Sequence, residues 1–230
     1  MGKNVAIIPA RGGSKRIPRK NVLPFAGVPM ITRSIQVARE SELFAQVIVS
    51  TDDEEIAEVA RAAGADVPFV RPLELADDHT PTIPVIRHAL SFAGGTPDFV
   101  CCLYATAPFV EAGDLRRGLE VLAGAGSEVD FVFPVASFPA PISRALRLDG
   151  QGNAEMINPE NDLARSQDLG EAYYDAGQFY WGAPEAFQSN SGILSARCRA
   201  IVMPRHRVQD IDTPDDWERA EILYRCLHHS

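Results

Sequence analysis

Residues 5–21 read VAIIPARGGSKRIPRKN, and this stretch decides how the rest of the chain is interpreted. It begins with an apolar run, Val5–Ile8, which has the length of a buried strand and is too short for a helix. Pro9 ends the hydrogen-bond ladder of that strand because proline has no backbone N–H. The loop that follows carries five cations and no acid between Arg11 and Lys20. A strand, a basic glycine-containing loop and then a helix form an arrangement by which proteins hold polyphosphates.

The glycines of this loop favour a phosphate-binding role over a merely solvated basic surface. Gly12 and Gly13 allow the backbone to approach a ligand closely and to turn its amides inward, and Ser14 adds a hydroxyl donor. Charge runs alone are most often solvated, so the interpretation depends on the strand and the glycines together. The loop has neither the GxxxxGK[ST] pattern of P-loops nor the GxGxxG pattern of dinucleotide sites. An NAD(P)-dependent oxidoreductase is therefore disfavoured.

The composition is that of an acidic globular protein. The 230 residues suit one domain with a small appendage, and the formal net charge of -9 at pH 7 argues against nucleic-acid binding. The basic loop is thus a local exception, which favours a small anionic ligand. The four cysteines form no CxxC motif, and neither a signal peptide nor a stretch of 18 apolar residues is present. We therefore expect a cytoplasmic protein with no membrane partner.

The first half of the chain alternates between strand and helix patterns. Further strands are expected at 46–50, 66–70 and 98–104, and helices after Pro29, at 53–63 and at 83–92. Continuous apolar strands that alternate with helices predict an α/β fold whose parallel sheet is covered on both faces. Ligands of such sheets bind beyond the carboxyl ends of the strands. The residues that fall there are Arg11, Thr51, Asp52, Ala105 and Thr106.

The second half changes character between Ser137 and Ala172, where the pattern weakens except for a hairpin predicted within 144–157. A polar, helix-free stretch of this length rarely stays unsupported inside a compact domain. We interpret 137–172 as a protruding arm that packs on a second subunit, and a disordered insert is the alternative. The remaining elements are strands at 131–135, where Pro134 indicates an edge or a bend, at 178–181 and at 199–203, and a helix at 214–227.

A second constellation, Asp210 and Asp212, lies in an extended segment near the end of the chain. Residues two apart in such a segment face the same side, so both carboxylates can converge on one cation. Oxygen ligands without nearby histidine or cysteine favour Mg²⁺ or Mn²⁺ over zinc. The competing interpretation is structural, because Thr213 and Pro214 have the chemistry of a helix start and Asp212 could assist it.

The string IPARGGSKRIPRKN at 8–21 resembles the nucleotide-binding signature of the CMP-sugar synthetases, the cytidylyltransferases that activate nonulosonic acids. The resemblance extends from Ile7 to Trp217 and includes VSTD at 49–52, RSQDL at 165–169 and DID at 210–212. It implies one Rossmann-like, mainly parallel, doubly wound nucleotidyltransferase domain over 1–230, with 137–172 as a dimerisation arm. The implied reaction transfers CMP from CTP to a nonulosonic acid and releases pyrophosphate, for cell-surface glycan biosynthesis. A homodimer and a divalent cation are implied as well.

The same resemblance implies roles for individual residues. Nucleotide binding would fall to Ala10, Arg11, Gly12, Gly13, Ser14, Lys20, Asn21, Thr80 and Thr82. Lys20 would neutralise the α-phosphoryl oxygens and Arg11 the leaving pyrophosphate, while Asp210, with Asp212, would hold the metal; these three, Arg11, Lys20 and Asp210, are the implied catalytic residues. The sugar acid would contact Tyr104, Thr106, Arg144, Arg165, Asp175 and Gln178, with Arg165 supplied by the arm of a partner subunit.

Two departures from the sialic acid synthetases bear on the sugar. Where those enzymes carry P-T-S-P-L-R after a Gln, this chain has YATAPFV at 104–110, and where they carry R-P-N-G it has YDAG at 174–177. The strings LYATAPF and YYDAGQFYWG instead resemble the branch that activates pseudaminic acid. N-acetylneuraminate and legionaminate remain alternative substrates. A non-catalytic nucleotide-binding regulator is the alternative from another class, and it would need the basic loop but not the paired aspartates.

Overall fold

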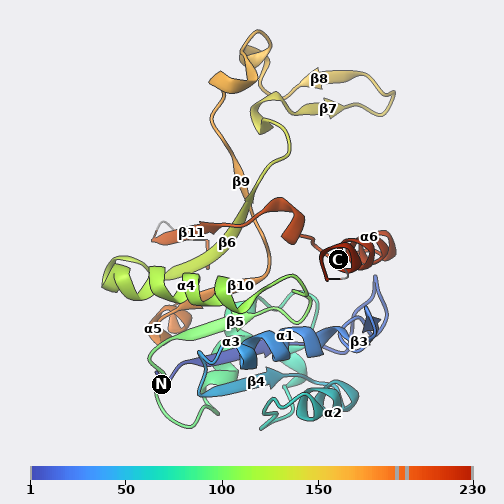
Figure 1. The fold of residues 1–230 in the computed structure, drawn as a ribbon. Helices are drawn as coiled ribbons and strands as arrows, with labels where there is room; N and C mark the ends of the chain where they lie inside the picture. Colours follow the sequence, from blue (N-terminus) through green and yellow to red (C-terminus); the bar gives the residue numbers. More distant parts are fainter. Residues whose placement is uncertain (1, 190–191, 195–196, 229–230) are drawn as a thin grey trace.

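The computed structural model describes residues 2–189, 192–194 and 197–228 (Figure 1). Its strands are β1 (Val5–Pro9), β2 (Pro24–Phe25), β3 (Val28–Pro29), β4 (Gln46–Ser50), β5 (Val100–Leu103), β6 (Phe131–Ser137), β7 (Leu146–Leu148), β8 (Ala154–Met156), β9 (Tyr173–Asp175), β10 (Phe179–Gly182) and β11 (Cys198–Val202). Its helices are α1 (Met30–Glu40), α2 (Glu54–Ala62), α3 (Thr82–Leu90), α4 (Ala112–Ala125), α5 (Pro184–Gln188) and α6 (Pro214–His228). No helix in these ranges is long and apolar enough to cross a membrane.

The predicted α/β class and mainly parallel central sheet are confirmed. The strand order is β11-β6-β10-β5-β1-β4, and β9 pairs with the outer part of β6. Strand β1 runs parallel to both of its neighbours, with Ile7 opposite Ile48 on β4 and Cys102 on β5. Strand β11 is likewise parallel to β6, whereas β10 lies antiparallel between β5 and β6.

Side chains of successive strand residues enter two separate cores, one on each face of the sheet. Ala6 and Ile8 belong to the core covered by α1, α2 and α4, which includes Ile35 and Leu115. Ile7 belongs to the other core, which is covered by α3 and α5. The strands read as continuous apolar runs because both of their faces are buried.

One local expectation is wrong. Residues 66–70 form no strand, and only Asp66 makes a bridge, to Ile48 of β4. Pro68 cannot donate the next ladder hydrogen bond, and Val70 is 70% exposed. The helix predicted after Pro29 is confirmed as α1, and a β2–β3 hairpin that the sequence pattern did not indicate lies between it and the basic loop.

Strand β6 carries the chain out of the sheet and into the arm. Its inner part pairs with β10 and its outer part with β9, and the change of partner occurs at Pro134, whose carbonyl accepts the Ala176 amide (3.0 Å). Beyond β6 the chain projects away from the body and bears the predicted hairpin, here β7–β8 (Figure 1). Large apolar side chains of this arm are exposed, namely Ile142, Leu146, Leu148, Ile157 and Leu163.

Helix α6 returns the end of the chain to the basic loop. Its Trp217 and Tyr224 rings pack edge-on against Phe25 of β2, each with ring centroids 5.4 Å apart. Glu221 of α6 also accepts a hydrogen bond from the Ala26 amide (2.8 Å). Since β2 follows the basic loop directly, these contacts place the residues before α6 beside that loop.

Replacing either of two glycines of α4 by alanine should change the free energy of unfolding, but in opposite directions. A Cβ at Gly118 would lie 2.8 Å from the Trp181 ring, which is buried and held by a hydrogen bond from its indole N–H to the Leu115 carbonyl. Gly118→Ala should therefore lower the free energy of unfolding by about 1–3 kcal/mol. A Cβ at Gly124 meets no atom within 4 Å, so Gly124→Ala should raise it by up to about 1 kcal/mol. Urea denaturation measures both, and equal effects would contradict the packing described.

Candidate active site

A cavity of about 620 Å³ opens where β1 and β5 end, at the edge predicted to hold the ligand. The basic loop forms one wall, residues 71–82 form another, and Asp212 reaches it from the segment before α6. Nine of the predicted site residues line this one cavity. They are Arg11, Ser14, Lys20, Asn21, Thr80, Thr82, Tyr104, Thr106 and Asp212.

The cations of the loop that face this cavity are paired with two aspartates. Arg11 Nη1 lies 2.5 Å from Asp78 Oδ1, and Lys15 pairs with the other oxygen of the same carboxylate. These two cations hold the pKa of Asp78 below its usual range, with Lys15 the larger influence. Arg16 lies 2.9 Å from Asp212 Oδ1, and Lys20 donates to the Ile211 carbonyl (2.5 Å) and lies 3.5 Å from the same Asp212 oxygen.

The shape of the loop is held by acids on the neighbouring strand end and helix. The Gly12 amide donates to Asp52 Oδ1 (3.0 Å), and a Cβ at Gly12 would lie 2.6 Å from Asp53 Oδ2. Asp53 in turn pairs with Arg19 through both oxygens and accepts the Ile56 amide at the start of α2. Gly12 is thus required by its contact with Asp53, and its amide is already bonded within the protein.

Arg71 is a residue of the cavity to which the sequence interpretation gave no role. Its guanidinium is buried, with Nε 3.0 Å from Ser50 Oγ and Nη2 bonded to the Ser50 carbonyl. Burial lowers the pKa of Arg71 to about 10, against the opposing influence of Asp52. Nothing in the local sequence pattern indicates that the Arg71 side chain turns back toward β4.

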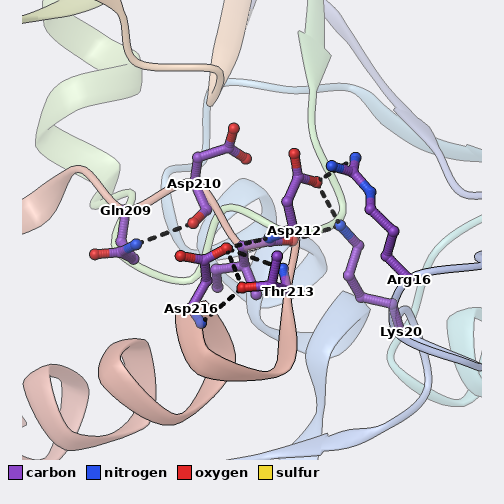
Figure 2. A network of polar contacts seen from close by, with 8 residues as sticks. Arg16, Lys20, Gln209, Asp210, Asp212, Thr213 and Asp216 are labelled. Carbon is purple, nitrogen blue, oxygen red and sulfur yellow. Dashed lines mark hydrogen bonds and ion pairs between the residues drawn. The ribbon is translucent and has the colours of Figure 1, made fainter. Parts of the chain in front are cut away.

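Among the described residues, the start of α6 does not use the carboxylates of Asp210 and Asp212, which is evidence against a purely structural role for the pair (Figure 2). Helix α6 is started by Thr213 and Asp216, since Asp216 accepts from the Thr213 amide (2.9 Å) and Thr213 Oγ1 accepts from the Asp216 amide (3.2 Å). Neither Asp210 nor Asp212 contributes its carboxylate to this cap within the described chain. Both carboxylates point to the same side, away from α6 (Figure 2).

The donor set at this position fits a hard cation that is completed by substrate. Partial removal from water and the nearby Asp212 raise the pKa of Asp210, while Lys20 opposes this. Among the described residues no group of three or more His, Cys, Asp or Glu side chains could hold a metal. Two carboxylates alone are typical of Mg²⁺ sites in which phosphate oxygens and water supply the remaining ligands.

A second cavity of about 510 Å³ adjoins the first and shares the side chains of Thr82 and Tyr104 with it. These two hydroxyls lie 3.1 Å apart, and burial raises the pKa of Tyr104 to about 12. Asp175 lines the second cavity and accepts hydrogen bonds from the Tyr180 hydroxyl (2.6 Å) and the Gly177 amide (2.9 Å). The other walls are mainly apolar and include Ile83, Ile193 and Leu194.

Several predicted residues lie away from both cavities. Arg144 and Arg165 are exposed on the arm. Gln178 is buried, and its amide donates to the Arg207 carbonyl (2.7 Å), so it lines neither cavity. Ala10, Gly12 and Gly13 also line neither cavity, but each is next in the chain to a residue that does. Asp210 lines neither cavity and lies two residues before Asp212, which lines the first.

Comparison with known proteins agrees with this geometry. A family model described as cytidylyltransferase matches residues 5–216. The chain is 43% identical over 231 aligned positions to the pseudaminic acid cytidylyltransferase of Campylobacter jejuni serotype O:2, with 99% of both chains covered. It is 33% identical to the CMP-N,N'-diacetyllegionaminic acid synthase of Legionella pneumophila, with 95% of both covered.

A solved structure shares the fold. It is the CMP:2-keto-3-deoxy-manno-octonic acid synthetase complexed with CTP, with a TM-score of 0.70 at 19% identity over 98% of this chain and 99% of that one. Together, the family match across most of the sequence and the full-length relatives agree with the loop, sheet and cavity described above. The chain belongs to the cytidylyltransferase family.

Proposed function

We propose that this protein transfers CMP from CTP to pseudaminic acid and releases pyrophosphate. The observation that carries the proposal is the pair of adjoining cavities, one lined by the basic loop and Asp212 and the other by mainly apolar groups. The first suits a nucleoside triphosphate and the second a sugar with few hydroxyls. The 43% identity to a pseudaminic acid cytidylyltransferase supports this choice of sugar. Because CTP is a cytoplasmic metabolite, we place the reaction in the cytoplasm.

The chemistry follows from the position of the cations. The anomeric hydroxyl attacks the α-phosphorus of CTP, and the bond to the β-phosphate breaks so that pyrophosphate leaves. Such transfers depend mainly on positioning and on neutralising phosphate charge. Lys20 would neutralise the α-phosphoryl oxygens, and Arg11 with Lys15 the leaving group. Since the Gly12 amide is bonded to Asp52, side chains and not that amide would bind the phosphates.

Asp210 and Asp212 would hold Mg²⁺ or Mn²⁺, which when bound supplies charge neutralisation between the nucleotide and the sugar acid. The paired aspartates also favour an enzyme over a non-catalytic nucleotide-binding regulator. Such a regulator would not need two carboxylates that take no part in starting α6.

The second cavity would select the sugar through apolar contact and a few polar groups, which include the charged side chains of Arg87 and Asp175. Pseudaminic acid carries a terminal methyl and acylamino groups where sialic acid carries a hydroxylated tail. Ile83, Ile193 and Leu194 would pack against the methyl, and the phenol of Tyr104 would remain neutral because its pKa is about 12. The carboxylate of Asp175 could accept an amide N–H of the sugar.

The arm would complete the site of a second copy of the chain. Several large apolar side chains of the arm are exposed, among them Leu163 at 95% and Leu148 at 66%, and exposed apolar groups that gather on one segment favour a protein–protein contact there. Arg165 belongs to the same arm and lines neither cavity of its own subunit, and the arm projects away from the body of the protein (Figure 1). We infer a homodimer with two-fold symmetry in which Arg165 reaches the sugar acid bound by the other subunit.

The function is tested by pyrophosphate release over a panel of sugar acids. With CTP and a divalent cation, kcat/KM for pseudaminic acid should exceed that for N-acetylneuraminic acid by about 10²-fold, a ratio that pocket contacts can supply. Legionaminic acid is the stringent control because it differs mainly in stereochemistry. Equal or better turnover of N-acetylneuraminic acid would show that the substrate is that of the sialic acid branch. No turnover of any sugar acid would refute the proposed reaction.

Removing either carboxylate of the metal site should abolish turnover without affecting folding. Asp210→Asn and Asp212→Asn should each lower kcat by about 10²-fold or more, because the metal contributes several kcal/mol of charge stabilisation. Asp215→Asn removes the same charge from the exposed first turn of α6 and is the matched control. Excess EDTA should also stop the wild-type reaction. Full turnover in EDTA, or melting temperatures that fall with activity, would contradict the assignment.

The two glycines of the loop offer a test of its geometry. Gly12→Ala should lower kcat by about 10-fold to 100-fold, because a Cβ 2.6 Å from Asp53 must displace the cations of the loop. Gly13→Ala, whose Cβ would meet no atom within 4 Å, should behave like the wild type. Steady-state pyrophosphate release measures both, and equal losses would show that the loop conformation is not the cause.

Shared sites predict complementation between inactive subunits. Arg165→Ala and Lys20→Ala should each be inactive, yet a mixture that exchanges subunits should regain partial activity because one of its two sites is intact. Arg11→Ala mixed with Lys20→Ala should regain none, since both lesions lie on the same subunit's side of the site. Sedimentation should show a dimer. A fully active monomer would refute the arrangement.

A further inference from the structure

Asp78 lies where an anionic ligand of the basic loop would have to bind. Its carboxylate lines the first cavity, contacts Arg11 at 2.5 Å with one oxygen and pairs with Lys15 through the other. The Asp78 side chain remains 32% exposed, so the contact is accessible to solvent and to ligands. It therefore occupies the donors that the proposed function assigns to the leaving phosphates.

The segment that presents Asp78 is held independently of these ion pairs. The neighbouring Asp77 accepts hydrogen bonds from the His79 amide (2.9 Å), the Thr80 amide (2.6 Å) and the Thr80 hydroxyl (2.7 Å). At the other end of the segment the Arg71 amide donates to the Thr51 carbonyl (2.7 Å). The Asp78 contact can therefore be broken and remade while the turn that carries it stays folded.

A carboxylate and a phosphate compete for the same partners. Both accept charge-assisted hydrogen bonds from guanidinium and ammonium groups, so Arg11 and Lys15 cannot fully serve both at once. A carboxylate left beside a bound polyphosphate also repels it. Binding of the phosphate chain thus requires Asp78 to give up its cations, and departure of the phosphates allows Asp78 to take them back.

We propose that Asp78 is an internal competitor of the β- and γ-phosphates that weakens the binding of pyrophosphate and so favours its release. This proposal rests on the proposed function, since it takes the first cavity to be the CTP site. Asp78 has no adjacent carboxylate in the described chain turned toward it to share a metal ion. Asp212 differs, because Asp210 lies beside it and the two together would hold the divalent metal. The carboxylate next to Asp78, that of Asp77, is turned to its own segment.

The test is isothermal titration of pyrophosphate and of CTP without sugar acid into the full-length protein. Asp78→Asn should bind both about fivefold more tightly than the wild type, the range expected for two exposed ion pairs. The difference should shrink at high ionic strength. Glu74→Gln is the matched control, because it removes one charge from the same segment and Glu74 is exposed and forms no ion pair with any described residue.

Product inhibition of the reaction provides the second measurement. Pyrophosphate should inhibit Asp78→Asn more strongly than Glu74→Gln. Asp78→Ala should match Asp78→Asn, which would show that the effect does not come from a hydrogen bond made by the new asparagine. Binding that is unchanged or weaker in both Asp78 variants would overturn the proposal, and weakening only when Mg²⁺ is present would make Asp78 a metal ligand instead. Failure of the wild type to bind CTP and pyrophosphate would refute the proposed function itself.

Discussion

The structure around the site depends on the neutralisation of one basic loop. Five cations within ten residues would repel one another, and the carboxylates that balance them come from three distant segments. Asp53 stands at the start of α2, Asp78 in the segment before α3, and Asp212 before α6. All three segments must therefore meet at the edge of the sheet where β1 ends. Together with the packing of α6 on Phe25 of β2, these ion pairs hold the last part of the chain beside the first.

These three acids are not equivalent, because Asp53 alone among them also accepts a backbone amide at the start of a helix with its carboxylate. Asp53 pairs with Arg19, which holds the pKa of Asp53 below its usual range, and the same carboxylate caps α2. Arg19 itself has a φ of 59°, a conformation that costs energy for a residue with a side chain. The Arg19–Asp53 pair therefore fixes the loop. The carboxylates of Asp78 and Asp212 pair with cations at the wall of the first cavity, where an anionic ligand would compete with them for those cations.

The sequence predicted the elements whose signals are local. Continuous apolar runs identified β4 and β5, and the rule that ligands bind beyond strand ends brought Arg11 and Thr106 to one cavity. Which residues distant in the sequence contact one another is not indicated by any local sequence pattern. Nothing near Asp78 in the chain indicates that it faces Arg11, and the apolar pattern of β10 does not reveal that it runs antiparallel. The β-branched pattern at 66–70 misled because Pro68 removes a donor.

The two cavities divide the chemistry of recognition between charge and shape. Cations of the basic loop line the first cavity. The second presents mainly apolar walls together with the charged side chains of Arg87 and Asp175 and the phenols of Tyr104 and Tyr180, whose pKa values are raised by burial. Of the residues that the structure describes, only Thr82 and Tyr104 line both cavities. Under the proposed function, changes in the second cavity would therefore alter the choice of sugar without disturbing the charges that face the phosphates. That separation gives a physical reason why relatives named for pseudaminic and for legionaminic acid both align with nearly the whole of this chain.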